Sequence, residues 1–321
     1  KCQFKMTTPS STEAVVFKAP GDITRRTLTL RELASDEIRV ETVYSGISTG
    51  TERLLYRGEM PSFPGMGYPL VPGYESVGRI VEVGSGAEAQ LDQWVFIPGA
   101  NCYQEARGLF GGASQQLQTS VQRVIPLSGD PGPQMVLLAL AATALHAIRL
   151  AGATLPDLVV GHGVMGRLAA RLTVALGGQP MVWETHADRR LDGEGYLTRD
   201  PAYCKGQQFD CILDASGAGD QLNHWVSSLS PGGQIILAGF YSQPLSFHFV
   251  PAFLRESQFK VAAQWQPTDL QAVSEMVHDG RLSLDGLVTD LMPATHPQQA
   301  YEKAFEDFAA LKVVMDWRCL S

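Results

Sequence analysis

The sequence has few cysteines, a deficit of positive charge and no hydrophobic run long enough to cross a bilayer. Its five cysteines are scattered without a C-x-x-C pair, which argues against a disulfide framework and a cysteine zinc cluster and favours a reducing compartment. The formal net charge of −8 argues against a nucleic-acid partner, because phosphates require a basic face. The most apolar stretch, Met135 to Ile148, is shorter than the ~20 residues that span a bilayer and predicts a buried helix. We therefore expect a cytoplasmic protein without a transmembrane segment.

The chain of 321 residues, 45% of them hydrophobic, is long enough for two domains with large cores. Its first part predicts short strands broken by glycine and proline, at 13–17, 37–45, 77–83, 94–98 and 121–125. From Pro131 onward a helix at 134–149 precedes strands that alternate with helices, at 158–160, 181–183, 209–213, 234–238 and 259–263. Such alternation is typical of a doubly wound parallel sheet. The remaining elements, expected to return to the first domain, are helices at 268–278 and 297–308 and strands at 287–291 and 312–317.

These patterns give expected domain bounds of 6–133, 134–265 and a C-terminal return over 266–321. Residues 1–5 precede Met6 and are expected to be sequence added for expression.

A glycine-rich turn follows the apolar run that ends at Val160. Gly161 would allow the tight turn, Gly163 the close approach of a pyrophosphate, and Gly166 the packing of the next helix, expected over 167–176. The turn residues that complete the motif are His162, Val164 and Met165, and His162 is expected to be exposed and able to touch cofactor phosphate or ribose. The spacing predicts a dinucleotide site.

An acidic residue, Glu184, ends the next buried strand at the place where a carboxylate binds the ribose 2′-hydroxyl. A 2′-phosphate would be repelled there, so the expected cofactor is NAD. Arg189 and Arg190 lie close by in sequence and could bind a 2′-phosphate, so NADP is the alternative cofactor.

Several segments resemble the medium-chain dehydrogenase/reductase superfamily over nearly the whole chain. They are Gly73 to Gly78, Thr143 to Ala147, Asp214 to Gly217, Pro231 to Gly233 and Lys312 to Trp317. The resemblance implies an α/β protein with a β-rich GroES-like N-terminal domain, completed by the C-terminal tail, and an inserted Rossmann domain with a doubly wound parallel sheet. It also adds Ser216, Gly239 and Phe240 to the expected cofactor contacts.

The residues at the superfamily's zinc positions depart from its pattern. Where zinc-dependent members have a cysteine, a histidine and a third ligand, this chain has Ser48 or Thr49, Tyr74 and about Ala139. Glu75 is the one retained donor, and hydroxyls are not customary zinc ligands. The resemblance therefore implies a catalytic site without a metal.

Hydroxyl groups would have to orient and deprotonate an alcohol in such a site. Thr51 and Tyr74 are the first candidates, Ser48 and Thr49 are weaker ones, and Glu75 is expected to anchor the turn. The alternative is that Tyr74 fills a vacated metal cavity and that the turn hydroxyls bind only local backbone. His146 is expected to be a satisfied helix histidine, although no partner for it can be named.

A narrower resemblance concerns the segments 45–55, 63–75, 107–112 and 238–242, which are similar to dehydrogenases of bacteriochlorophyll biosynthesis. It implies a tetrapyrrole substrate whose hydroxyethyl group is oxidised. Such a wide apolar ring needs aromatic and methionine surface and a few polar anchors. The candidates for ring contact are Phe63, Met66, Tyr68, Phe110 and Trp265, and those for the ring's carboxylate are Arg53, Arg57 and Arg107.

Two other functions stay open at this point. One is a zinc-free quinone or enoyl reductase of the same superfamily that uses NADPH, and the other is a non-enzymatic nucleotide-binding protein. Glu184 disfavours the first, and the intact glycine turn weakly disfavours the second. A homodimer is also left open.

Overall fold

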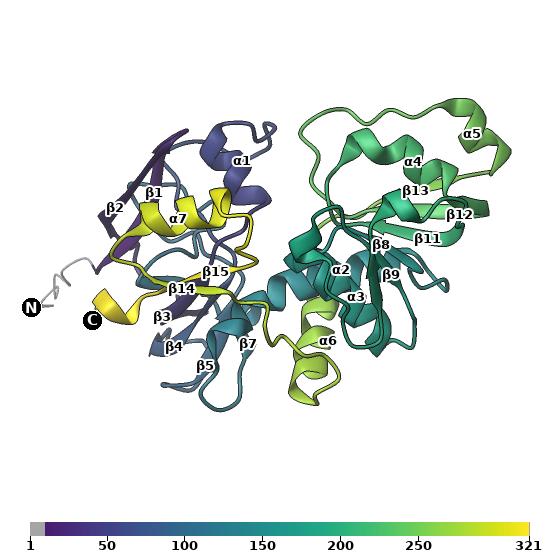
Figure 1. Cartoon of the computed structure of the whole chain (residues 1–321). Helices are drawn as coiled ribbons and strands as arrows, with labels where there is room; N and C mark the ends of the chain where they lie inside the picture. The colour runs from purple at the N-terminus through teal and green to yellow at the C-terminus, as the bar shows by residue number, and fades with distance from the viewer. Residues whose placement is uncertain (1–9, 321) are drawn as a thin grey trace, which may run out of the picture. The chain divides into compact units, whose positions relative to one another are not determined.

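The computed structural model describes residues 10–320 and divides the chain into two compact units. Unit 1 holds the residues up to Val136 and those from Val288 onward, and unit 2 holds Leu137 to Leu287 (Figure 1). Cys2 and the expected added residues 1–5 lie outside the described residues.

Unit 1 is built on a hairpin and a larger mixed sheet. The hairpin pairs β1 (Ser11–Ala19) with β2 (Asp22–Thr29), and in the sheet β6 pairs with β3 outside the main strand order. The strands of that order are β14 (Asp290–Pro293), β15 (Val313–Asp316), β3 (Glu37–Gly46), β4 (Ser76–Val83), β5 (Trp94–Ile97) and β7 (Ile125–Pro126), with β6 at Gln116–Ser120. Its helices are α1 (Thr51–Arg57), α7 (Pro297–Glu306) and the short turns η1 (Val121–Arg123), η2 (Pro133–Leu137) and η6 (Arg318–Leu320).

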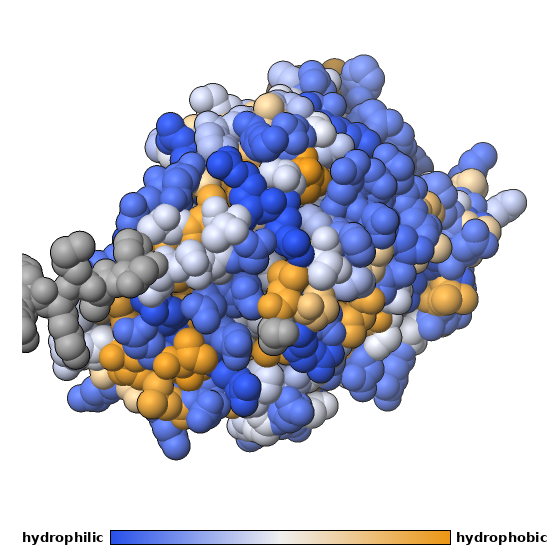
Figure 2. Space-filling model, turned by 90° about the vertical axis from the view of Figure 1, so that its left-hand side faces the viewer, coloured by the Kyte–Doolittle hydropathy of each residue, from blue (hydrophilic) through white to orange (hydrophobic). Residues whose placement is uncertain are grey.

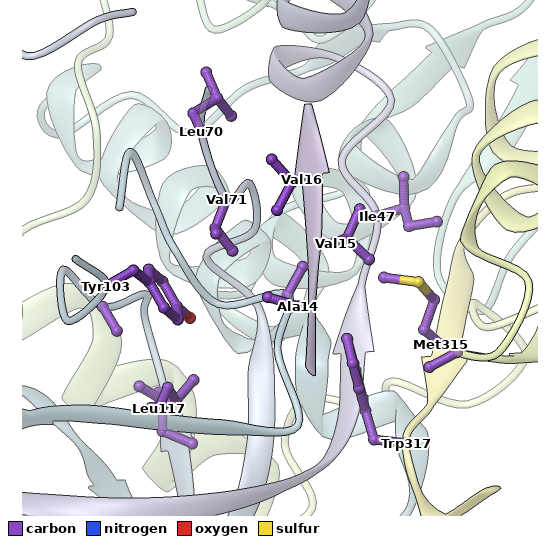
Figure 3. Packing of buried hydrophobic residues seen from close by; sticks show 14 of the residues in the cluster. Ala14, Val15, Val16, Ile47, Leu70, Val71, Tyr103, Leu117, Met315 and Trp317 are labelled. Atoms are coloured by element: carbon purple, nitrogen blue, oxygen red, sulfur yellow. The ribbon is translucent and has the colours of Figure 1, made fainter. Parts of the chain in front are cut away.

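The C-terminal tail completes unit 1, as the sequence predicted. β15 pairs antiparallel with β3, and the indole Nε1 of Trp317 donates to Ser45 Oγ at 2.8 Å. The hydrophobic core of unit 1, which includes Trp317, packs β1 against segments that are distant from it in the sequence (Figure 3). Its buried members include Ala14, Val15, Val16, Ile47, Leu70, Val71, Tyr103, Leu117, Met315 and Trp317.

Unit 2 contains the doubly wound parallel sheet. Its strands in spatial order are β10 (Leu197–Arg199), β9 (Met181–Trp183), β8 (Leu158–Val160), β11 (Phe209–Asp214), β12 (Leu229–Leu237) and β13 (Gln258–Val261). All neighbouring strands run parallel, which confirms the expected fold class. The helices are α2 (Leu138–Leu150), α3 (Val164–Ala175), α4 (Leu222–Ser227), α5 (Phe249–Leu254), α6 (Pro267–His278) and the short turns η3 (Ala187–Arg189), η4 (Pro201–Tyr203) and η5 (Gly219–Gln221).

Some local expectations differ from the structure. The strand expected at 121–125 is wrong, because Val121–Arg123 forms a 3-10 turn between β6 and β7. Strand β2 was not predicted from the sequence, because its exposed arginines and threonines hide the alternation of a half-buried strand. The segment 266–287, expected in the C-terminal return, groups with unit 2 because α6 packs on α2.

The contact between α2 and α6 explains that placement. Asp269 near the start of α6 accepts from His146 Nδ1 at 2.9 Å and from Arg149 Nη1 at 2.6 Å, both on α2. His146 therefore has a partner that the sequence could not identify.

The expectation that the most apolar stretch is too short to cross a membrane is wrong by length and composition alone, because among the described residues the helical stretch Pro133–Leu150 is long and apolar enough. Most side chains of α2 within it are buried in the protein, as expected for a core helix. On the face shown in Figure 2, hydrophobic residues gather in separate patches between hydrophilic ones.

Candidate active site

The turn between β3 and α1 carries the expected catalytic hydroxyls. Gly46 ends β3, and a Cβ there would lie 2.2 Å from Glu75 Oε2, so a side chain would collide with this carboxylate. The Ser48 amide donates to Glu52 Oε1 at 3.1 Å, which fixes the turn to the first residues of α1. Thr49 lies in the same turn, and its side chain makes no hydrogen bond to the described residues.

Tyr74 points its hydroxyl at this turn. It donates to Ser48 Oγ at 2.7 Å, and Thr51 lies within hydrogen-bonding reach of it. The ring is held by an edge contact with Phe110 at 5.3 Å between centroids. The structure thus brings together Ser48, Thr51 and Tyr74, three of the residues that the sequence singled out.

The protonation state of Tyr74 follows from its surroundings. Burial, reinforced by the nearby Glu75 carboxylate, raises its pKa well above the usual tyrosine value. The phenol is therefore neutral at physiological pH and acts as a hydrogen-bond donor rather than as a standing base.

Glu52 is a buried carboxylate next to Ser48, Thr51 and Tyr74, which we call the hydroxyl cluster. Its Oε2 accepts from the Tyr301 hydroxyl of α7 at 2.7 Å. Burial raises the pKa of Glu52 to about 7, against the lowering effect of the bonds from Tyr301 and the Ser48 amide. Tyr301 was not predicted from the sequence to be part of this site.

A buried ion pair joins Glu75 to Lys312. Lys312 Nζ donates to Glu75 Oε2 at 2.6 Å and to the Ile47 carbonyl at 3.0 Å. Burial raises the pKa of Glu75, and the ammonium opposes that rise. Lys312, which was not predicted from the sequence, therefore links the Glu75 carboxylate to the Ile47 carbonyl of the turn.

The side chains at this site do not fit a catalytic zinc. Residues 10–320 contain no group of three histidine, cysteine or acidic side chains that could hold a metal ion. The two hydroxyls of Ser48 and Tyr74 bond to each other, and the one retained donor, Glu75, is paired with an ammonium group. A tetrahedral zinc requires a different set of donors.

The glycine turn of unit 2 has the geometry of a dinucleotide site. Gly161 has a φ of +92° and lies against Ser216, where a Cβ would come within 3.0 Å. A Cβ on Gly166 would lie 1.8 Å from the Gly161 carbonyl oxygen, so only glycine allows α3 to pack this closely. The helix begins at Val164, earlier than expected, which places its first amides directly behind Gly163.

Glu184 stabilises this turn through two hydrogen bonds from backbone amides. Its carboxylate accepts from the His162 amide at 3.0 Å and from the His186 amide at 2.9 Å. Each carboxylate oxygen has a second lone pair, so a ribose hydroxyl could still be bound.

The expectation that His162 is exposed is wrong. The residue is 0% exposed, and its ring contacts the Arg189 carbonyl at 2.7 Å and the Tyr196 hydroxyl at 3.0 Å. The segment 189–196 folds over the ring, and burial lowers the pKa of His162. Its side chain is a structural element of the turn.

The carboxyl ends of β11 and β12 complete the cofactor region. Asp214 accepts from the Ser216 amide at 2.9 Å and from the hydroxyl of Tyr241. Gly239 lies so close to Gly217 that a Cβ would approach it to 2.7 Å, and Phe240 beside it is 51% exposed. Open α/β sheets bind ligands at such strand ends.

The expected substrate residues divide between the two units. Phe63, Met66, Tyr68 and Phe110 pack against the core of unit 1, whereas Trp265 belongs to unit 2. The Tyr68 hydroxyl donates to the Leu55 carbonyl and ties its loop to α1. The expected anchors Arg53 and Arg57 lie on α1, and Arg107 is exposed beside Gly67.

A GroES-like unit joined to a Rossmann unit is the domain arrangement of the medium-chain alcohol dehydrogenases. The alcohol dehydrogenase GroES-like domain family matches residues 34–129. The chain also superposes on the butanediol dehydrogenase of Bacillus subtilis with a TM-score of 0.83 and 19% identity, over 96% of this chain and 100% of the other.

Two curated relatives are much more similar in sequence. The 2-desacetyl-2-hydroxyethyl bacteriochlorophyllide A dehydrogenase of Rhodobacter capsulatus is 48% identical over 96% of this chain and 98% of its own length. The protein of the same name from Cereibacter sphaeroides is 47% identical over the same shares. The chain therefore belongs to the medium-chain dehydrogenase/reductase superfamily, in the family of these bacteriochlorophyllide dehydrogenases.

Proposed function

We propose that this protein oxidises the 3-(1-hydroxyethyl) group of a bacteriochlorophyllide a precursor to a 3-acetyl group with NAD, in bacteriochlorophyll biosynthesis. The near full-length identity to two dehydrogenases named for this kind of substrate carries the proposal. In the reaction the carbinol carbon loses a hydride and the hydroxyl loses a proton, so the products are the ketone, NADH and H⁺.

The hydroxyl cluster supplies the chemistry at the alcohol oxygen. Tyr74, neutral because its pKa is raised, donates a hydrogen bond that stabilises the developing alkoxide, and Thr51 beside it orients the alcohol. Ser48 accepts from Tyr74 in the resting site, and the proton released by the alcohol passes along these hydroxyls to solvent water, since neither hydroxyl is basic enough to keep it. Bound NAD supplies the hydride acceptor.

The protein positions that cofactor with residues of unit 2. The glycine turn and the first amides of α3 bind the diphosphate, and the Glu184 carboxylate binds the adenosine ribose. Phe63, Met66, Tyr68, Phe110 and Trp265 are the proposed contacts of the tetrapyrrole ring.

The proposed reaction is tested by mixing the protein with NAD and 3-hydroxyethyl bacteriochlorophyllide a and recording the absorption spectrum. We expect a shift of the pigment bands together with NADH formation, and poor turnover of a short secondary alcohol, because ring contacts are needed to align the carbinol. Equal specificity constants for the two alcohols would contradict the proposal. Reduction of quinones with NADPH would favour the reductase alternative, and nucleotide binding without turnover the non-enzymatic one.

Cofactor preference gives a second prediction. NAD is expected to bind at least tenfold more tightly than NADP, about 1.4 kcal/mol, because Glu184 repels a 2′-phosphate. Titration calorimetry with Glu184→Gln should show a smaller difference between the affinities for NAD and NADP. The added phosphate would be met by Arg189, whose guanidinium lies 3.8 Å from a Cβ placed on Gly163.

Arg190 is already bound to Asp200 and is not expected to contribute. An unchanged preference in Glu184→Gln would show that the carboxylate does not contact the ribose. Melting temperature is the control, since the same carboxylate holds two backbone amides.

A homodimer in the cytoplasm is the proposed state of the protein. The four cysteines among the described residues are free, which suits a reducing compartment.

The edge of the sheet in unit 2 is the proposed dimer contact. β13 ends the strand order of its sheet, and neighbouring apolar side chains are strongly exposed, with Phe249 at 70% and Val261 at 75%. A second copy could pair with this strand and cover them. Sedimentation should show a dimer that Val261→Asp dissociates and that Leu91→Asp, on the exposed surface of unit 1, does not.

A further inference from the structure

Arg53 on α1 differs from the other partly buried arginines of residues 10–320 in lacking a hydrogen-bond or ion-pair partner. It is partly buried, and within those residues its guanidinium has neither a hydrogen bond nor an ion pair. Every other partly buried arginine in that range has a partner. For example, Arg39 pairs with Glu82, and Arg167 donates to the His162 carbonyl.

The charge environment of Arg53 is unfavourable. Burial lowers its pKa, Arg57 one helical turn away lowers it further, and Glu59 opposes these effects only in part. Like charges four residues apart on a helix destabilise it. An anion bound beside α1 would offset the cost of burying the Arg53 guanidinium and would weaken its repulsion with Arg57.

The position of Arg53 points to the substrate as the source of that anion. It lies on the first turn of α1, as Thr51 does, and Thr51 lies within hydrogen-bonding reach of Tyr74. The loop that carries Phe63 and Met66 is tied to the same helix through the Tyr68 hydroxyl and the Leu55 carbonyl. Hydroxyls, apolar surface and an unpaired cation therefore share one short helix and its neighbours.

We propose that Arg53 binds the propionate carboxylate of the tetrapyrrole and makes the enzyme selective for the free acid over its alkyl esters. This inference rests on the proposed function. A planar guanidinium can donate two parallel hydrogen bonds to a carboxylate, whereas an ester carries no negative charge and accepts only weakly.

The test compares two substrates, 3-hydroxyethyl bacteriochlorophyllide a and its methyl ester, in the same detergent. The wild-type protein should oxidise the free acid with at least a tenfold higher kcat/KM. In Arg53→Gln the kcat/KM for the acid should fall about 10- to 100-fold, mostly through KM, while that for the ester changes less than about threefold. Arg53→Lys should keep part of the selectivity, because it retains the charge and loses the paired geometry.

Arg26→Gln is the matched control, since it removes one exposed positive charge from β2 in the same unit. An equal fall for acid and ester in Arg53→Gln would show that Arg53 supports the fold, and it would overturn the proposal. Equal rates for acid and ester in the wild-type protein would also overturn it, with the proposed function intact. Oxidation of neither pigment would instead reject the proposed function itself.

Discussion

Replacing Tyr74 by phenylalanine is expected to lower kcat about 100-fold and to leave NAD affinity nearly unchanged. The variant removes the hydroxyl that donates to Ser48 at 2.7 Å. It keeps the ring, whose edge contact with Phe110 at 5.3 Å holds the side chain in place. The glycine turn and Glu184, which bind NAD in this proposal, belong to the other unit. The loss should therefore appear in the chemical step, measured as single-turnover oxidation of the pigment.

Tyr56→Phe is the control for this substitution. Tyr56 lies on α1 and packs edge-on to Phe17 at 6.1 Å, so its variant removes a phenolic hydroxyl from the same unit without touching the cluster. A mild effect of Tyr74→Phe combined with a large effect of Thr51→Val would move the main role in proton transfer to the threonine. Mild effects of both would reject the hydroxyl cluster as the catalytic centre.

Replacing Lys312 by methionine is expected to destabilise the protein by about 3–5 kcal/mol, because it leaves the buried Glu75 carboxylate without its counterion. The variant also removes the bond from Lys312 Nζ to the Ile47 carbonyl, so the catalytic turn should loosen. Urea denaturation followed by tryptophan fluorescence measures the loss, and Trp317 beside β3 reports on unit 1.

The pH dependence of the stability of Lys312→Met shows whether the lost ion pair causes the destabilisation. Burial raises the pKa of Glu75 in the folded protein, and without the ammonium it should rise further. A carboxyl whose pKa is higher in the folded than in the unfolded state loses stability as pH rises above the unfolded value. The destabilisation by Lys312→Met should therefore be larger at pH 8 than at pH 5. The double variant with Glu75→Gln should recover most of the loss, and equal losses at both pH values would contradict the ion-pair explanation.

Local sequence patterns predicted the parts of the molecule that depend on neighbouring residues. The glycine turn and the strands β8, β9 and β11 follow from spacing and from short apolar runs, which are local signals. The hydroxyls that we propose as catalytic could be named because the superfamily's turn and its metal positions are recognisable in the chain.

The missed residues of the site are distant in sequence from their partners. Lys312 is 237 residues from Glu75, and Tyr301 is 249 residues from Glu52, so no local pattern connects them. The burial of His162 could not be predicted for the same reason, since its ring contacts Tyr196, which lies 34 residues later in a turn just before β10. Glu75 was expected to anchor the turn, but the ammonium through which it does so could be found only in three dimensions.

The late position of β15 has a consequence for how the protein folds as it is synthesised. Residues 137–287 form unit 2 and leave the ribosome as one continuous segment, so that unit can fold while translation continues. The first unit has to wait, because the strand beside β3 and the counterion of Glu75 are translated after the whole of unit 2. A nascent chain released before Lys312 would thus carry a folded nucleotide-binding unit and an unfinished catalytic one. Such a chain would leave residues 44–46 of β3 without their partner strand, and unpaired strand edges promote aggregation.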